Sequence, residues 1–308
     1  MSQNESVNGA RRTPVDPDFD PFADLLDVLD LSILESDRYE GRSQPQPHGR
    51  VFGGQVLAQS LIAAGLTVRD LDDVDERPRD VHSMHAYFLR AGDAERPITF
   101  EVERLRDGRS FSARRVLALQ YDRPILAMSA SFQTLDEGIS HQDAMPQVAP
   151  PEELPSVAEL LHGVADGPAK KWAERRAIDI RHVEGSMYLE PAAERATRQN
   201  VWIRATGDLP KDPLFNAAVL AYASDYTLLE AVLRHHGISW SDPRLRPASL
   251  DHSMWFHRPA RADDWILYSQ ASPSAQGGRG LGIGRMFARD GTLVASVAQE
   301  GMLRLRGS

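Results

Sequence analysis

The strings VHSMHAYFLR, residues 81–90, and LDHSMWFHRP, residues 250–259, are two related segments of one chain of 308 residues. Each joins a His-Ser-Met string to an aromatic pair and an arginine. When the two arginines are aligned, at an offset of 168 residues, the aromatic pairs at 87–88 and 255–256 coincide as well. Because this offset is about half the chain, the sequence predicts an internal repeat with one strand of this kind in each half.

The segments that follow the two strings have the same order in both halves. Residues 98–103 alternate apolar and polar side chains, the period of a strand with one buried face. Turn signals at 107–108 and 122–124 then separate two more strand candidates. In the second half, DWILYSQAS is followed by a glycine-rich strand candidate, a turn at 290–291 and TLVASVAQEGMLRL. Each half is therefore expected to form an antiparallel meander.

One apolar helix is predicted ahead of each set of strands. Residues 53–66 and 225–237 each place apolar side chains on one face, and Gly65 and Gly237 are the expected helix ends. An antiparallel sheet needs one face covered, and such a helix can cover it. The sequence thus predicts an α+β fold in which each half is a helix packed on an antiparallel sheet.

The chain is expected to divide into four segments. Residues 1–20 mix acids, Asn, Pro and a basic pair, and we interpret them as a disordered tail. Residues 21–138 form the first predicted domain and residues 196–308 the second. Between them, residues 139–195 are rich in Pro and Glu and read as a linker that carries one or two helices, for example SVAELLHGVA.

Composition excludes several classes of protein. The sequence has 35 basic and 44 acidic residues, a formal net charge of −9, which argues against nucleic acid or an anionic membrane as the main partner. No apolar run approaches the roughly 18 residues of a membrane span. There is no cysteine, which excludes disulfides, thiolate metal sites and a Cys nucleophile. The expected location is cytoplasmic.

The common nucleotide, nucleophile and metal motifs are absent. GGRGLGIG, residues 277–284, matches neither G-x-G-x-x-G nor a phosphate loop, and glycines in a strand usually allow close approach of another backbone or a ligand. No G-x-S-x-G nucleophile elbow is present. His235 and His236 are adjacent, so on a helix they point to different faces and cannot easily hold one ion. We therefore predict no cofactor and no metal.

Asp225 is the leading candidate for chemistry in the second half. At the start of a predicted helix it is either an N-cap or, if Ser224 caps instead, a free carboxylate facing a cleft where helix amides can stabilise an oxyanion. Ser249 and Gln299 are unremarkable alone. In the first half the position of Asp225 falls near Gln55, so that half lacks the carboxylate. One half is thus expected to hold the active groups and the other to complete the groove.

Five arginines form a basic concentration in this acidic chain. Most are interpreted as solvated charges on strands, and some as candidates to meet a phosphorylated ligand. They are Arg104, Arg106, Arg109, Arg114 and Arg115.

Seven strings spread over residues 20–305 resemble the type II acyl-CoA thioesterases: RVFGGQVLAQSL, VHSMHAYFLRAGD, RDGRSFSARRV, ASFQ, YASD, LDHSMWFHRP and LVASVAQEG. The resemblance implies a tandem double hot-dog fold, each half a long helix packed on an antiparallel sheet, with the sheets joined edge to edge. It implies hydrolysis of fatty acyl-CoA to free fatty acid and CoA. It also implies a homo-oligomer, a dimer or a tetramer.

The resemblance also assigns a catalytic set. Asp225 in YASD, Ser249 just ahead of the second string and Gln299 in AQEG match the residues with which the family holds and activates the attacking water. A covalent acyl-enzyme is not expected. The histidines of the two opening strings, including His82 and His252, are interpreted mainly as scaffold residues.

Two rival functions remain open at this point. A double hot-dog enoyl-CoA hydratase would share fold and substrate, but its D-x-N-P-x-H signature is missing from the segment YTLLEA after Asp225. In a non-catalytic acyl-CoA-binding protein the three residues would be structural. Thiol release from acyl-CoA, compared with an absorbance change on crotonyl-CoA, separates these functions.

Overall fold

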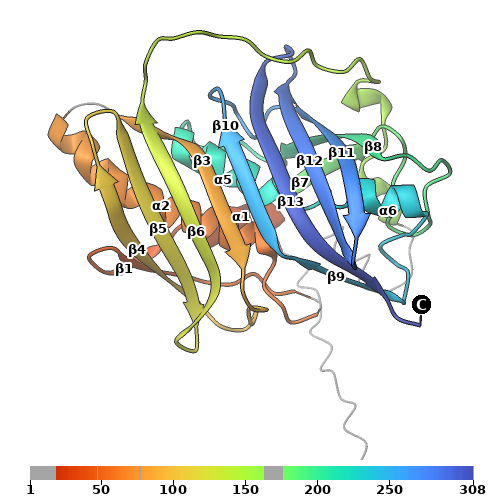
Figure 1. The fold of residues 1–308 in the computed structure, drawn as a ribbon, viewed down its shortest axis with the longest axis horizontal. Helices are drawn as coiled ribbons and strands as arrows, with labels where there is room; N and C mark the ends of the chain where they lie inside the picture. The colour runs from red at the N-terminus through yellow and green to blue at the C-terminus, as the bar shows by residue number, and fades with distance from the viewer. Residues whose placement is uncertain (1–18, 47, 76–77, 163–175, 308) are drawn as a thin grey trace, which may run out of the picture.

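The fold is built on one antiparallel sheet with helices packed against one face of it (Figure 1). A computed structural model describes residues 19–46, 48–75, 78–162 and 176–307, with the side chains of 70–75 left aside. The strands of the first half are β1 (Ser32–Glu35), β2 (Arg38–Gly41), β3 (Arg79–Phe88), β4 (Ile98–Asp107), β5 (Phe111–Gln120) and β6 (Arg123–Thr134). Those of the second half are β7 (Ile178–His182), β8 (Arg198–Ala205), β9 (Leu245–Ser249), β10 (Asp251–Phe256), β11 (Ile266–Gln276), β12 (Arg279–Ala288) and β13 (Leu293–Leu305).

The two repeated strings lie side by side at the centre of this sheet. The strand order is β1-β2-β4-β5-β6-β3-β10-β13-β12-β11-β8-β7, with β9 also paired to β13. β3 and β10 are antiparallel, and Met84 lies opposite Met254 in their register. The two meanders are therefore joined edge to edge, which confirms the α+β fold with two sheets merged into one.

The first-half helix is longer than predicted. Helix α2 spans Gly53–Asp75, so Gly65 does not end it. A Cβ on Gly65 would lie 2.3 Å from Cδ2 of Leu214, at the start of the neighbouring helix α5. Gly65 is thus a point of close helix packing, because only a residue without a side chain fits there.

The second-half helix does not begin at Asp225 as predicted. Helix α5 (Pro213–Ser224) is N-capped by Asp212 and is buried over nearly its whole length. A turn follows, and helix α6 (Glu230–His236) ends at Gly237, whose φ is 64°. The predicted end at Gly237 is confirmed, whereas α5 was missed because a helix buried on all sides has no amphipathic period.

The predicted tail and linker are only partly described. Residues 1–18 lie outside the described residues, while Asp20 caps helix α1 (Pro21–Leu29). Within the predicted linker, η1 (Pro151–Glu153) and helix α3 (Val157–Leu161) form, the latter with a capping box at Ser156. β7 also lies within residues 139–195 and pairs with β8 at the sheet edge.

The glycine-rich strand β12 lies against the chain around the turn between α5 and α6. A Cβ on Gly282 would lie 2.6 Å from the carbonyl oxygen of Leu228, and one on Gly280 would lie 2.7 Å from the Val232 side chain. This confirms the interpretation that the glycines permit close backbone packing. The contact also fixes the turn that follows Asp225.

Candidate active site

The three residues predicted for catalysis meet on the helix-covered face of the sheet. Nε2 of Gln299 donates to Oδ1 of Asp225 at 2.6 Å and to Oγ of Ser249 at 2.8 Å. The Ser249 hydroxyl lies 3.3 Å from the same carboxylate oxygen. A carboxylate, a hydroxyl and an amide are therefore joined in one hydrogen-bonded group.

Asp225 reaches this group from the C-terminal end of a helix. It is the C-cap of α5, with φ −80° and ψ −8°, and its backbone N–H donates to Ala223. The prediction that Asp225 starts a helix, as an N-cap or beside a capping Ser224, is therefore wrong. Ser224 is the last residue of α5, and the carboxylate is free of any capping role in its own helix.

A change of register brings Ser249 onto the same face as Gln299. Ser249 lies opposite Gly301 on β13, whereas Ser253 lies opposite Ala298, so β9 and β10 differ by one residue in register against β13. The extra residue at Leu250 is a β-bulge, a feature that re-aims side chains. Without it, strand alternation would place Ser249 and His252 on opposite faces.

The start of helix α2 completes the surroundings of the carboxylate. A Cβ on Gly53 would lie 2.6 Å from Oδ2 of Asp225, and a Cβ on Gly54 would lie 2.3 Å from the carbonyl oxygen of Tyr222. The backbone N–H of Gly54 donates to the Asp225 carboxylate. The helix N-terminus at the site thus belongs to the first half, and the Gly53-Gly54 pair was the overlooked sequence signal for it.

Burial raises the pKa of Asp225 to about 6. Hydrogen bonds from Gln299, Gly54 and Ser249 stabilise the ionised form and oppose this effect. The carboxylate is consequently ionised at neutral pH, yet basic enough to accept a proton.

Gln55, near the first-half position that corresponds to Asp225, has a structural role. Gln55 is fully buried, and its Oε1 accepts from the backbone N–H of Gln44 at 3.0 Å. Its Nε2 donates to the carbonyl of Arg42 and to Gln59. The amide therefore holds the chain before α2, consistent with the expectation that only the second half carries the carboxylate.

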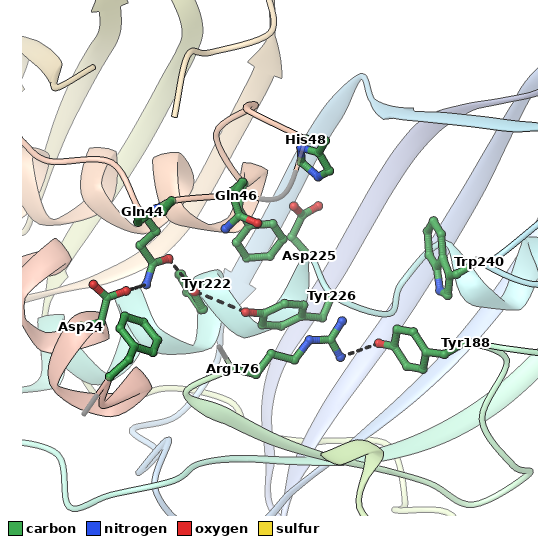
Figure 2. Close-up of a pocket in the computed structure, with 13 residues that line it drawn as sticks. Asp24, Gln44, Gln46, His48, Arg176, Tyr188, Tyr222, Asp225, Tyr226 and Trp240 are labelled. Carbon is green, nitrogen blue, oxygen red and sulfur yellow. Dashed lines mark hydrogen bonds between the residues drawn. The ribbon is translucent and has the colours of Figure 1, made fainter. Parts of the chain in front are cut away.

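Asp225 lies at the wall of a pocket of about 180 Å³ (Figure 2). The pocket is formed by both halves and by the end of the predicted linker. Its lining combines aromatic and polar side chains: Phe19, Asp24, Gln44, Pro45, Gln46, His48, Phe52, Arg176, Tyr188, Tyr222, Asp225, Tyr226 and Trp240. The arrangement opens the Asp225 carboxylate to a ligand in the pocket.

The pocket wall is held by ordered polar contacts. Tyr222 donates to Oε1 of Gln44 at 2.7 Å, and the Tyr226 hydroxyl donates to that of Tyr222 at 3.2 Å. Arg176 donates to the Tyr188 hydroxyl at 2.7 Å and lies over the rings of Tyr188 and Tyr226 (Figure 2). These residues were not identified from the sequence, because they come from segments far apart in it.

A buried carboxylate behind the pocket anchors the turn after Asp225. Glu230 accepts from His182 at 2.7 Å, from Trp240 at 2.9 Å and from Gln199 at 3.0 Å. Burial alone would raise its pKa, but the charge and hydrogen bond of His182 and the other donors lower it below the usual value. Trp240, a pocket residue, is thereby fixed to the first turn of α6.

Three of the five clustered arginines are engaged by acidic residues. Arg114 is fully buried, pairs with Asp107 at 2.7 Å and donates to Thr67. It is not the solvated strand charge that was expected for most of the cluster. Arg104 pairs with Asp37 and Arg115 with Glu103. Any role of these three toward a phosphate would require breaking an existing ion pair.

No metal centre is evident in the part of the chain that the structure describes, where no three His, Asp or Glu side chains gather suitably. Within the same residues, no helix combines the length and apolar character needed to cross a membrane.

Comparison with known proteins identifies the class to which the molecule belongs. Residues 42–133 match the family model of the acyl-CoA thioesterase N-terminal domain, and residues 183–302 match that of acyl-CoA thioesterase. A hot-dog-fold protein of unknown function from Alicyclobacillus acidocaldarius shares the fold at 21% identity, with a TM-score of 0.72 over 91% of this chain and 98% of that chain. The molecule is thus a hot-dog-fold thioester hydrolase by class.

More similar relatives define the family. Human acyl-coenzyme A thioesterase 8 is 40% identical over 304 residues, covering 93% of this chain and 92% of the relative. Acyl-CoA thioesterase 2 of Haemophilus influenzae is 36% identical, covering 92% and 98%. The crystal structure of an acyl-CoA thioesterase II, TesB2, of Mycobacterium marinum is 44% identical, with a TM-score of 0.74 over 92% of this chain and 99% of that chain. The chain belongs to the type II acyl-CoA thioesterase family.

Proposed function

We propose that this thioesterase hydrolyses fatty acyl-CoA by attack of a water that Asp225 deprotonates. The observation that carries the proposal is the hydrogen-bonded group of Asp225, Ser249 and Gln299 at the wall of the pocket. Water is a poor nucleophile at neutral pH, so a positioned base is needed. A carboxylate with a pKa of about 6 meets that need.

The other two residues are assigned to orientation. Gln299 and Ser249 both contact Oδ1 of Asp225, which leaves Oδ2 on the side of Gly53. Water bound beside the carboxylate would give one proton to Asp225 as its oxygen bonds to the thioester carbonyl carbon. The C–S bond then breaks, and the leaving CoA thiolate takes the proton from Asp225, so no acyl group is transferred to the protein and no burst of acyl-enzyme is expected.

The start of α2 is the best source of donors for the developing oxyanion. The first backbone N–H groups of a helix have no partner within the helix and carry its positive dipole end. Here that end, at Gly53-Gly54, adjoins the carboxylate; the Gly54 N–H already donates to Asp225, which leaves the Gly53 N–H as the candidate donor. Pre-aimed donors of this kind contribute strongly to acyl transfer reactions.

Thiol release from acyl-CoAs of several chain lengths tests the proposal. We expect Asp225→Asn to lower kcat by about 100-fold or more, because the general base is lost, with an unchanged circular dichroism spectrum. Asp251→Asn is the matched control: this residue accepts the N–H of Glu300 near the site but has no part in the group. Turnover by Asp225→Asn at the wild-type rate would refute the mechanism.

The rival functions are distinguished in the same experiments. Hydration of crotonyl-CoA without thiol release would favour an enoyl-CoA hydratase. Tight binding of acyl-CoA with no turnover would favour a non-catalytic binding protein. The family match and the linked carboxylate, hydroxyl and amide favour the hydrolase.

We also propose a cytoplasmic homo-oligomer, a dimer or tetramer. The complete lack of cysteine supports a reducing compartment.

Two exposed aromatic side chains support association at the junction of the halves. Tyr87 and Trp255 lie on the outer face there and are 65% and 39% exposed. Light scattering should give a mass above one chain and a lower mass for Trp255→Lys; a monomeric wild type would contradict it.

A further inference from the structure

His252 lies directly beside Gln299 in the core of the second half. β10 and β13 pair antiparallel with Ser253 opposite Ala298, so His252 and Gln299 are the next residues in the same register. Side chains opposite each other in such a pair share a face and lie about 5 Å apart at Cβ. Both residues are buried, at 0% and 1% exposure.

Each of the two side chains has one buried polar atom that makes no hydrogen bond of ordinary geometry among the described residues. These atoms are Nδ1 of His252 and Oε1 of Gln299. The opposite ends are engaged, since Nε2 of His252 lies 2.9 Å from Oγ of Ser224 and Nε2 of Gln299 contacts Asp225 and Ser249. A buried polar atom left unpaired costs about 1–3 kcal/mol, so two such atoms on facing side chains need an explanation.

The position of the proton on the neutral His252 ring explains these two atoms. Burial lowers the pKa of His252 to about 4 against the opposing effect of a contact with Gln299, so the ring is neutral at physiological pH and carries one N–H. With the proton on Nε2, a lone pair on Nδ1 would face the carbonyl oxygen of Gln299. With the proton on Nδ1, the ring donates to that oxygen. The Ser224 hydroxyl has one proton, and in this tautomer it donates that proton in a hydrogen bond to Nε2 of His252 instead of to the Ala221 carbonyl, which lies 2.8 Å from it.

We propose that His252 is a positioning residue that donates a hydrogen bond from Nδ1 to Oε1 of Gln299 and holds the amide with Nε2 toward Asp225 and Ser249. A rotated amide would present its oxygen to the Asp225 carboxylate, which would repel it. The inference rests on the proposed function, because it assigns His252 a role through Gln299. It revises the interpretation of this histidine as scaffold.

Three substitutions at one position test the role. In His252→Asn the side-chain NH₂ occupies the place of Nδ1 and can still donate to Gln299. In His252→Gln it reaches the place of Nε2 and keeps the Ser224 contact, and His252→Leu has no donor. We expect kcat within about threefold of wild type for His252→Asn and a fall of about 10- to 100-fold for the other two, the range found when groups that orient catalytic ligands are removed. KM should change little.

Retained kcat in His252→Gln and His252→Leu, or an equal loss in His252→Asn, would overturn the inference. Gln299→Ala separates it from the proposed function. If Gln299→Ala turns over like wild type, the proposed mechanism fails; if it loses activity while the histidine variants do not differ, only the role of His252 fails.

A measurement on the unaltered protein needs no variant to fold. Nitrogen NMR of wild-type protein labelled with ¹⁵N-histidine distinguishes the two neutral tautomers, and the signal absent from His252→Asn, or from His252→Gln, assigns the residue. We expect the Nδ1–H tautomer, the minor form of free histidine. An Nε2–H tautomer would refute the proposed hydrogen bond.

Discussion

At the scale of the residue, the candidate active site depends on opposing effects on one carboxylate. Burial makes the ionised form of Asp225 less stable, while three donors from three separate segments restore part of that stability. The result is a pKa of about 6, well above the ordinary value of 3.8. A base with such a pKa combines ionisation at neutral pH with useful proton affinity.

The pH dependence of turnover follows from this pKa. Since Asp225 must be ionised to accept a proton, kcat should rise with pH and reach half its plateau near the pKa of about 6. Stopped-flow thiol detection between about pH 5 and pH 8 measures it. A flat profile over this range, or a decline with rising pH, would exclude Asp225 as the base.

The raised pKa of Asp225 should also lower the stability of the folded protein at neutral and alkaline pH. The folded-state pKa of about 6 is above the ordinary value of 3.8, so between these values the folded protein holds more protons and loses stability as pH rises. Asp225→Asn removes this cost. Its free energy of unfolding should exceed that of wild type by about 2–3 kcal/mol near pH 8 and by little near pH 4, in urea titrations. A less stable variant near pH 8 would contradict the shift.

At the scale of the element, two local features place the group. The bulge between β9 and β10 turns Ser249 inward, and the glycine pair at the start of α2 lets a first-half helix meet a second-half carboxylate. Both features decide whether the polar atoms of the group lie within hydrogen-bond distance of one another.

Gly53→Ala should therefore impair catalysis without unfolding the protein. The added Cβ would lie 2.6 Å from Oδ2 of Asp225, and the carboxylate, as the end of a side chain, can move away. We expect kcat to fall about 10- to 100-fold, the effect of a misplacement of about 1 Å. Gly138→Ala, where no atom lies within 4 Å of the added Cβ, is the control. Equal kinetics for both variants would show that the close approach of α2 at Gly53 is not needed for catalysis.

The sequence identified the three residues that the structure brings together in one hydrogen-bonded group, but not their surroundings. The sequence could identify these residues because each stands in or beside a string that resembles a family motif. It could not identify the start of α5, since a helix buried on every side shows no apolar stripe. For this reason Asp225 was assigned to the wrong end of a helix. The bulge depends on pairing with a strand about 50 residues away, which local alternation cannot reveal.

At the scale of the molecule, the two halves share one hydrophobic core. Buried side chains of one continuous cluster include Leu57 and Met84 from the first half and Met254 and Val297 from the second. The sheet is continuous through β3 and β10, and the pocket draws side chains from both halves. A shared core and a continuous sheet are therefore expected to make the two halves unfold as one cooperative unit.

This cooperativity predicts that damage in the first half unfolds the second. All five tryptophans lie at position 172 or later, so their fluorescence reports on the second half, whereas Leu57 is a fully buried residue of α2. Leu57→Ala removes core contacts at a cost of about 2–5 kcal/mol and should lower the thermal midpoint by tryptophan fluorescence and by far-ultraviolet circular dichroism equally. Val297→Ala, in the second half, is the matched comparison and should also shift both signals together. If Leu57→Ala lowered only the circular dichroism midpoint while the fluorescence midpoint stayed at its wild-type value, the halves would unfold independently and the single core would have to be abandoned.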